Sequence, residues 1–217
     1  MLSYHFSVPV RLALKAGVAV TAECGRCSMA PNPVLLRFSS LLEDADLEGP
    51  VLDLACGSGE NGLFLAGLGL PVVLADRSAE ALEEARRSAA RRGLAAEFWE
   101  VDLETGANPL PEEYYRAVLV FRYLHRPLIP HLRRTLRKGG IVIYETFTVE
   151  QPKYGRPHNP DFLLQPGELA GWFQDWEIIH QFEGLLKDPP RAMAQIVCRK
   201  PAGHAQAVAS NPIMHSG

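Results

Sequence analysis

Short apolar runs alternate with amphipathic stretches along most of this chain. A short apolar run bounded by turn-forming residues is typical of a buried strand, and apolar positions three or four residues apart are typical of a helix that buries one face. The pattern predicts strands at residues 51–55, 72–75, 97–101, 116–121 and 141–145. It predicts helices at residues 34–42, 61–68, 79–92 and 128–137. This alternation predicts a mostly parallel sheet with helices on both faces.

The last third of the chain has a different pattern. It predicts a short helix at residues 168–173, and then two apolar segments, 176–182 and 192–199, that form a hairpin with a long connection. An antiparallel pair of this kind suits the edge of a sheet that is otherwise parallel. The complete prediction is an α/β fold with a doubly wound, mostly parallel, seven-stranded sheet and an antiparallel last strand.

Length and composition indicate a single domain. The chain has 217 residues, of which 47% are hydrophobic, and this is enough for one sizeable core. We expect the domain to span residues 34–200. An N-terminal appendage of uncertain order at residues 1–33 and a flexible tail at 201–217 would flank it.

Charge and hydropathy restrict the partners. The net charge of −3 gives no electrostatic footprint for nucleic-acid binding. No apolar stretch approaches the ~20 residues of a membrane-spanning helix, and Arg11 and Lys15 interrupt the only segment that resembles a secretory leader. We therefore expect a cytoplasmic protein that acts on a small-molecule substrate, without nucleic acid or membrane as a partner. The oligomeric state stays open.

The cysteines predict neither a metal site nor a nucleophile. Cys24 and Cys27 have the C-x-x-C spacing of half a zinc site, but the sequence has no second such pair and no nearby histidine pair. Cys56 and Cys198 have no neighbouring base in the sequence. We expect reduced thiols and no bound metal.

The strongest chemical signal is a glycine-rich turn after the first predicted strand. Gly57, Gly59 and Gly62 have the spacing G-x-G-x-x-G, at which backbone amides and a helix N-terminus bind the pyrophosphate of a dinucleotide. Asp53 lies just before this turn and would repel a pyrophosphate. It would attract a cationic ligand, and S-adenosylmethionine (SAM) carries a sulfonium and an ammonium group on a nucleoside. The turn therefore predicts a SAM site.

Two further acids follow the next two predicted strands: Asp76 after 72–75, and Asp102 after 97–101. The ligand of a parallel sheet lies outside the carboxyl ends of the strands, where these acids and the turn would meet. Asp76 lies 19 residues after Gly57 (76 − 57), near the ~20-residue spacing at which an acid binds ribose hydroxyl groups. Each acid alone could be a turn former. Their coincidence with one glycine turn favours a ligand that has cationic groups and a ribose.

Four segments at the predicted strand ends carry a family pattern: Val51-Leu-Asp-Leu-Ala-Cys-Gly-Ser-Gly59, Leu74-Ala-Asp-Arg-Ser78, Val101-Asp-Leu103 and Leu136-Arg-Lys-Gly-Gly-Ile-Val-Ile-Tyr-Glu145. Together they resemble the class I SAM-dependent methyltransferases, over about residues 34–200. Three further segments, Tyr123-Leu-His-Arg126, Tyr144-Glu-Thr-Phe147 and Gly155-Arg-Pro-His-Asn-Pro-Asp-Phe-Leu-Leu164, resemble a bacterial subgroup near the tellurite-resistance methyltransferases.

The resemblance implies a Rossmann-like methyltransferase fold and a role for each residue near the turn. Asp53 would contact the methionine ammonium group, and the glycines would let the backbone approach the methionine part and the ribose. Asp76 would accept both ribose hydroxyl groups, Asp102 would accept the adenine amine, and the amide of Leu103 would donate to the adenine ring. The implied cofactor-binding residues are Asp53, Ala55, Gly57, Gly59, Asp76, Arg77, Asp102, Leu103 and Phe121.

Residues after the fourth and fifth predicted strands are candidates for the transfer step. His125 is the first candidate for a general base because the usual pKa of histidine lies near neutral pH, and Glu145, at a strand end, is the second. Tyr123 would line the methyl-transfer site. The loop at residues 151–166 is long enough to close over an acceptor. The residues expected to bind a small polar or anionic acceptor are Arg122, Arg126, Tyr154 and Arg156.

Three other functions stay open at this point. The glycine spacing allows an NAD(P)-dependent oxidoreductase, although Asp53 argues against it and the chain has no evident Y-x-x-x-K pair. An RNA or protein methyltransferase is the second alternative, although no Asn/Asp-Pro-Pro-aromatic motif follows the fourth predicted strand. A SAM-binding regulator without catalytic activity is the third.

Overall fold

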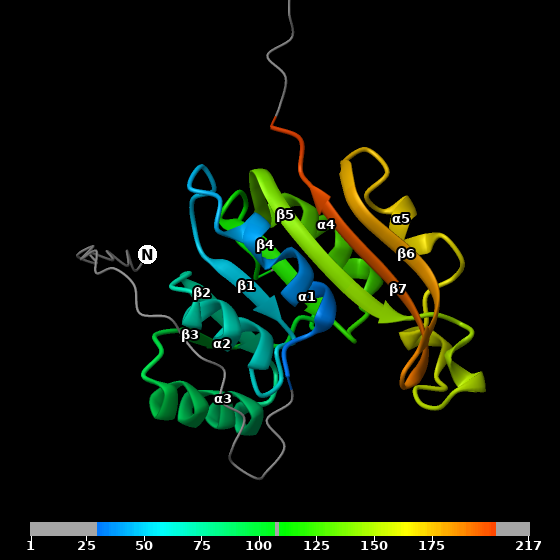
Figure 1. Ribbon diagram of the computed structural model, residues 1–217, viewed down its shortest axis with the longest axis horizontal. Coiled ribbons are helices and arrows are strands. Elements are labelled where there is room, and N and C mark those ends of the chain that lie inside the picture. Colours follow the sequence, from blue (N-terminus) through cyan, green and yellow to red (C-terminus); the bar gives the residue numbers. More distant parts are fainter. Residues whose placement is uncertain (1–29, 107–108, 203–217) are drawn as a thin grey trace, which may run out of the picture.

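The computed structural model describes residues 30–106 and 109–202, which contain a seven-stranded sheet. The strands are β1 (Val51–Leu54), β2 (Val72–Asp76), β3 (Glu97–Glu100), β4 (Tyr115–Phe121), β5 (Leu136–Phe147), β6 (Glu177–Lys187) and β7 (Pro190–Arg199). Their order is β3-β2-β1-β4-β5-β7-β6 (Figure 1). The first five strands are parallel, and β7 is antiparallel to both β5 and β6. The predicted doubly wound sheet with an antiparallel last strand is confirmed.

Helices cover both faces of this sheet. They are α1 (Pro33–Phe38), α2 (Glu60–Gly67), α3 (Ala79–Arg92), α4 (Ile129–Thr135) and α5 (Glu168–Gly171), with 3-10 helices η1 (Ser39–Leu42), η2 (Arg126–Leu128), η3 (Gln151–Lys153) and η4 (Pro160–Phe162). Residues of α1, α2 and α3 share one apolar core, and residues of α4 and α5 belong to the other. Figure 1 shows α1 and α2 in front of the sheet and α4 behind it.

Strand β1 positions the first acid. Val51 belongs to the core under α1, α2 and α3, whereas Leu52 and Leu54 belong to the core on the opposite face. Because successive side chains of a strand alternate, Asp53 lies on the same face as Val51, beneath α2. The chain order reverses between β1 and β4, so the carboxyl ends of these two strands border the crevice where a doubly wound sheet binds its ligand.

The predicted boundary between the fourth helix and the fifth strand is wrong. Helix α4 ends at Thr135, and β5 begins at Leu136, which pairs with Tyr115. Gly139 and Gly140 therefore lie inside β5. Gly139 has a φ angle of 76°, and a Cβ on Gly140 would lie 2.8 Å from the carbonyl oxygen of Arg137. These glycines permit an irregular strand start where backbones approach closely.

The predicted long connection of the hairpin is also wrong. Strand β6 runs to Lys187 and β7 starts at Pro190, so only two residues, Asp188 and Pro189, connect them. Strand β6 is at the sheet edge, and its side chains largely alternate between exposed and half-buried positions. Polar residues such as Glu183 occupy exposed positions there, and this makes an edge strand resemble a loop in the sequence.

The predicted appendage and tail lie mostly outside the described residues, as do Cys24 and Cys27. The proposed domain boundaries therefore stay predictions. Across residues 30–106 and 109–202, no helix has the length and apolarity needed to cross a membrane. In the same ranges, no group of His, Cys, Asp and Glu side chains could hold a metal ion.

Candidate functional site

Two adjoining cavities open at the carboxyl ends of the central strands. The first cavity has a volume of about 640 Å³ and the second of about 540 Å³. Ala55, after β1, and Arg122, after β4, line both. These two residues have φ angles of 54° and 56°, in the left-handed region that costs a residue with a Cβ about 1–2 kcal/mol. Strain of this kind collects at functional sites, so the junction of the two cavities is the candidate site.

The glycines of the turn after β1 have different structural roles. Gly57 has a φ angle of 55°, and a Cβ there would meet no atom within 4 Å, so its backbone faces open space. Gly59 takes the left-handed conformation at the N-cap of α2, with a φ angle of 79°. A Cβ on Gly62 would lie 2.4 Å from Cδ2 of Leu74. Gly57 therefore lets a ligand approach the backbone, and Gly62 lets α2 pack closely on the sheet.

Asp53 is a buried acid at the second cavity. The residue is 1% exposed, and its Oδ2 accepts a hydrogen bond of 2.8 Å from the backbone amide of Gly62. Burial, opposed in part by this hydrogen bond, raises the pKa of Asp53 from 3.8 to about 7, and the negative charge of Asp76 contributes to the rise. A cation in the second cavity would stabilise the ionised form. This carboxyl group therefore favours a cationic ligand over an anionic one.

The structure brings Asp76 and Asp102 together at the first cavity. Oδ2 of Asp76 accepts a hydrogen bond of 2.8 Å from the amide of Gly57, and its Oδ1 accepts one of 2.9 Å from the amide of Ser78. These bonds fix the carboxylate at the cavity wall and leave each oxygen a lone pair for a ligand. Leu103 lines the same wall, and its backbone amide donates to no acceptor within the described chain.

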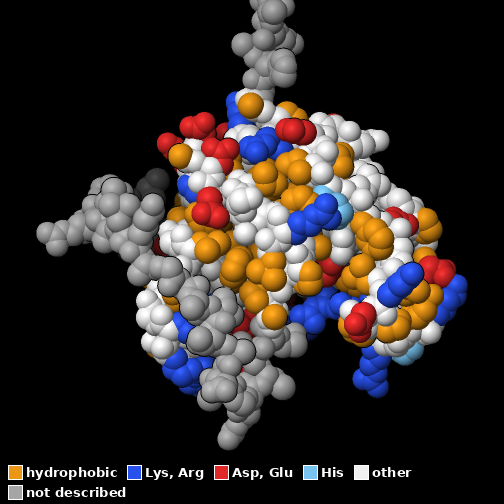
Figure 2. All heavy atoms as spheres, viewed as in Figure 1, with side chains coloured by type: hydrophobic (Ala, Val, Ile, Leu, Met, Phe, Trp, Pro, Cys, Tyr) orange, Lys and Arg blue, Asp and Glu red, His pale blue; other side chains and the backbone are white. Residues whose placement is uncertain are grey.

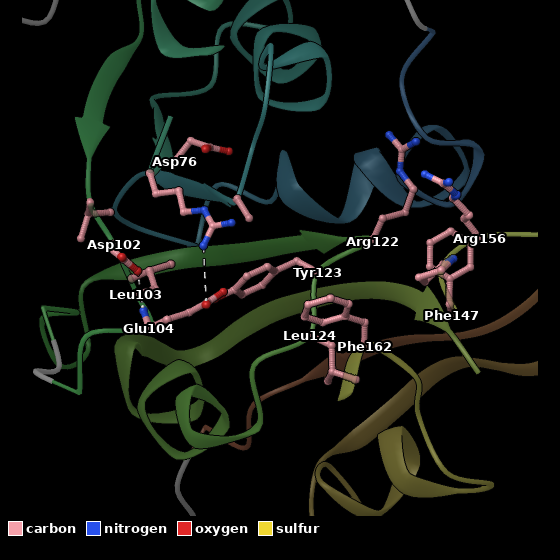
Figure 3. A pocket seen from close by; sticks show the side chains of 14 residues that line it. Asp76, Asp102, Leu103, Glu104, Arg122, Tyr123, Leu124, Phe147, Arg156 and Phe162 are labelled. Atoms are coloured by element: carbon pink, nitrogen blue, oxygen red, sulfur yellow. Dashed lines mark hydrogen bonds and ion pairs between the residues drawn. The ribbon is translucent and has the colours of Figure 1, made fainter. Parts of the chain in front are cut away.

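An ion pair lies across one end of the first cavity. Nη1 of Arg77 lies 3.6 Å from Oε2 of Glu104, with 68% and 40% of the two side chains exposed; a dashed line in Figure 3 marks this contact. Tyr123 lines the same cavity. Burial, together with the charges of Glu104 and Asp102, raises the pKa of Tyr123, so its hydroxyl group stays protonated at neutral pH. Tyr123 therefore offers the cavity a neutral hydroxyl group. Phe121 lines the second cavity.

Two arginines lie at the opposite end of the first cavity. Arg122 and Arg156 both line it, and Figure 3 shows their guanidinium groups at the same end, above Phe147. Neither side chain has an ion pair or a hydrogen bond within the described chain. The space-filling view shows basic side chains around a hollow near the carboxyl ends of the strands (Figure 2). Two unpaired cations repel each other unless an anion binds between them, so this end suits an anionic group.

Arg126 and Tyr154, both expected to bind the acceptor, line neither of these cavities. Nε of Arg126 lies 2.6 Å from Oε1 of Glu168, and its other nitrogens donate to the carbonyl oxygens of Asp161 and Leu163. Arg126 therefore ties the loop after β5 to the segment after β4. Tyr154 is 43% exposed and borders a separate hollow.

The two candidate bases are also not among the lining residues of either cavity. His125 is half-buried at the N-cap of η2 and lines neither cavity. Glu145 is 3% exposed, and its two oxygens accept hydrogen bonds of 2.6 Å from Nδ2 of Asn32 and Nε2 of Gln195. Both oxygens are thus held by amide donors. This arrangement suits Glu145 to anchor the start of α1, not to take a proton from an acceptor.

The sequence analysis gave no site role to several residues that line the second cavity, among them Asn32, Asn61 and Arg191. The amide of Asn32 donates to Oδ1 of Asn61 over 2.8 Å, which joins the start of α1 to α2. Arg191 lies in β7, and its Nε is buried without a hydrogen-bond partner within the described chain. An asparagine before a helix signals only an N-cap, and no local pattern connects an arginine near the C-terminus to the glycine turn.

Comparisons with known proteins give a family signal over the segment that contains the glycine turn and the three acids. Residues 51–140 match a family model described as a methyltransferase domain. The chain is 28% identical over 141 residues to Hemagglutinin 1 of Eikenella corrodens, covering 62% of this chain and 46% of that protein. It is 23% identical over 141 residues to the probable S-adenosyl-L-methionine-dependent methyltransferase TehB of Haemophilus influenzae, covering 62% of this chain and 48% of that protein. The chain spans about half the length of these curated relatives.

Solved structures show the same fold. The crystal structure of TehB from Haemophilus influenzae matches with a TM-score of 0.60 and 22% identity, covering 75% of this chain and 62% of that one. Magnesium protoporphyrin IX methyltransferase from Synechocystis, with bound S-adenosylhomocysteine (SAH), matches with a TM-score of 0.59 and 18% identity, covering 77% and 81%. These likenesses concern the arrangement of strands and helices.

Proposed function

Because the chain belongs to the class I SAM-dependent methyltransferases, we propose that it transfers the methyl group of SAM to a small polar or anionic acceptor. The proposal rests above all on one observation. A buried carboxyl group, Asp53, adjoins the open backbone at Gly57, and Asp76 and Asp102 line the neighbouring cavity. A diphosphate would meet three acids there, whereas a ligand with an ammonium group, a sulfonium group and a ribose would be bound by them.

The two cavities divide the cofactor between them in this proposal. The nucleoside lies in the first cavity, where Asp76 accepts the ribose hydroxyl groups, Asp102 accepts the adenine amine, and the free amide of Leu103 donates to the ring. The methionyl group lies in the second cavity, with its ammonium group at Asp53. The sulfur is bonded to both parts, so it lies at the junction lined by Ala55 and Arg122.

The transfer is an in-line displacement. The acceptor's attacking atom forms a bond to the methyl carbon while the bond from carbon to sulfur breaks, and the sulfur leaves as the neutral thioether of SAH. The protein's contribution is to orient the two reactants and to exclude water. An acceptor that carries a free lone pair at neutral pH needs no general base. This is consistent with the observation that neither His125 nor Glu145 lines either cavity.

An anionic acceptor has a specific place in this arrangement. Arg122 and Arg156 are unpaired at the end of the first cavity opposite Asp76 and Asp102, next to the junction. If the two arginines bind a carboxylate, a phosphate or another oxyanion of the acceptor, the acceptor would reach the methyl group from the side of Phe147. Arginine suits this role because its planar guanidinium group binds such anions through two parallel hydrogen bonds.

Calorimetric titration tests cofactor identity. We expect SAH to bind the protein and NADH not to bind. Asp76→Asn should weaken the binding of SAH at least tenfold because a carboxylate is replaced by an amide beside the ribose. The control Asp46→Asn changes an exposed acid that lines neither cavity and should leave the affinity for SAH unchanged. Binding of NADH without SAH would contradict the proposal. Incubation with SAM and a panel of small carboxylates and phosphates, followed by mass detection of SAH and methylated product, then tests the acceptor class.

A further inference from the structure

We infer that Arg191, on the C-terminal hairpin, binds the carboxylate of the cofactor's methionyl group in the second cavity. This inference rests on the proposed function and extends it to a residue outside the family-matched segment 51–140. It assigns a cofactor contact to the antiparallel part of the sheet, to which the glycine turn and the three acids do not belong.

The covalent structure of the methionyl group places its carboxylate. The ammonium and carboxylate groups are bonded to the same carbon atom, so a cavity that takes the ammonium group also takes the carboxylate. The ammonium group is drawn to the buried Asp53. The carboxylate must therefore lie in the second cavity as well, a short distance from an acid that repels it.

The charges of the second cavity leave two possible partners. Its acidic lining residues are Asp53 and Glu60, and its basic lining residues are Arg122 and Arg191. Burial raises the pKa of Glu60, but its carboxyl group still offers no positive charge to an anion. Among the charged side chains that line this cavity, only the two arginines can pair with a carboxylate.

Of the two, Arg191 is the better placed. Arg122 is exposed and lies with Arg156 at one end of the first cavity. Arg191 is half-buried, and its Nε is one of two buried side-chain nitrogen or oxygen atoms in the described chain without a hydrogen-bond partner. The other is Nε of Arg116, on β4, whose Nη1 donates to the carbonyl oxygen of Leu42. A buried N–H group without an acceptor is unfavourable, and a ligand carboxylate would satisfy it.

The backbone around Arg191 is held by a buried side chain. Gln151 is 3% exposed, and its Oε1 accepts a hydrogen bond of 2.8 Å from the amide of Ala192, directly after Arg191. Nε2 of the same Gln151 donates over 3.0 Å to the carbonyl oxygen of Arg156. One glutamine thus fixes the backbone at both arginines. This supports a preformed position for Arg191 at the cavity.

The test compares SAM with decarboxylated SAM, which keeps the ammonium and sulfonium groups and lacks only the carboxylate. Dissociation constants are measured by calorimetry for the wild type, Arg191→Met, Arg191→Lys and the control Lys187→Met, which removes a charge from the same hairpin away from the cavities. A charge-assisted hydrogen bond corresponds to about a 10- to 100-fold change in affinity. Far-UV circular dichroism and a melting curve check that each variant folds.

We expect Arg191→Met to weaken the binding of SAM by about 10- to 100-fold and the binding of decarboxylated SAM by less than twofold. The affinity of Arg191→Lys for SAM should lie between those of the wild type and Arg191→Met. Lys187→Met should match the wild type. Equal effects on both ligands, or no effect on SAM, would overturn the inference and leave the proposed function intact. A raised acceptor KM with unchanged SAM affinity would also overturn it, since Arg191 would then belong to the acceptor site. If the wild type bound neither SAM nor decarboxylated SAM, the proposed function itself would fail.

Discussion

Asp53→Asn should stabilise the ligand-free protein while it removes cofactor binding. Asp53 is 1% exposed, and within the described residues its side chain makes one hydrogen bond, which Oδ2 accepts from the amide of Gly62. Asparagine has almost the same shape, and its carbonyl oxygen can accept the same bond. The substitution therefore removes an ionisable group from the core and leaves the packing unchanged.

The size of the effect follows from the pKa of Asp53. Burial raises this pKa from 3.8 to about 7, so between these values the folded protein holds a proton that the unfolded chain has released. Stability therefore falls as the pH rises through this window. A shift of about 3 pKa units corresponds to about 4 kcal/mol, which is the most that Asp53→Asn can add above pH 7. About half of the difference should develop between pH 5 and pH 7.

Urea unfolding of both proteins at several values between pH 5 and pH 8, without ligand, measures this difference. The gap in the free energy of unfolding should widen toward pH 8, and SAM should stabilise only the wild type. A SAM ammonium group beside Asp53 also favours its ionised form, so cofactor binding at pH 6 should release a proton. If the two unfolding free energies kept a constant difference from pH 5 to pH 8, the pKa of Asp53 would not be raised, and the electrostatic argument for a cationic ligand would be wrong.

Three further substitutions separate structural residues from residues of the site. Arg126→Gln breaks the contact with Glu168 and should lower the free energy of unfolding by about 1–2 kcal/mol in a urea titration; a loss of SAM affinity would show instead that it belongs to the cofactor site. Glu145→Ala leaves the amide of Gln195 without its acceptor and should cost about 2–4 kcal/mol by the same assay, and an unchanged stability would refute the anchoring role. Arg122→Gln removes a cation from the junction, so the affinity ratio of SAM to SAH, measured by calorimetry, should rise roughly threefold, because only SAM carries a sulfonium charge. An unchanged ratio would place the sulfur elsewhere.

The parts of the fold that depend on local signals could be predicted from the sequence. Helix α3 has the predicted bounds because Ser78 caps its first turn and Gly93, with a φ angle of 63°, ends it. The central strands are apolar on both faces and therefore stand out. Strand β6 could not be delimited, because an edge strand with exposed polar positions has the composition of a loop. The glycines at the start of β5 were misassigned because a close backbone contact and a helix end require the same residue type.

Some residues of the candidate site could likewise be predicted from the sequence, and others could not. Asp76 and Asp102 were expected at the cavity because the position of a residue at a strand end follows from chain order alone in a parallel sheet. The role of Glu145 could not be predicted in this way, because it depends on Asn32 and Gln195, which are distant in the sequence. Arg191 was missed for the same reason. Side chains that contact each other across the sheet leave no periodic signal in a single sequence.

The junction of the two cavities connects the charge of the acceptor with the chemistry. If the nucleoside and the methionyl group occupy separate cavities, the sulfonium lies beside Arg122, and two positive charges then meet in a partly enclosed space. An anionic acceptor at Arg122 and Arg156 would neutralise this repulsion and so favour binding of both reactants together. Once the methyl group has moved, the sulfur is neutral, and the attraction between the sulfonium and the anionic acceptor is lost. The two arginines would therefore favour binding of the two reactants together, whereas the two products no longer attract each other.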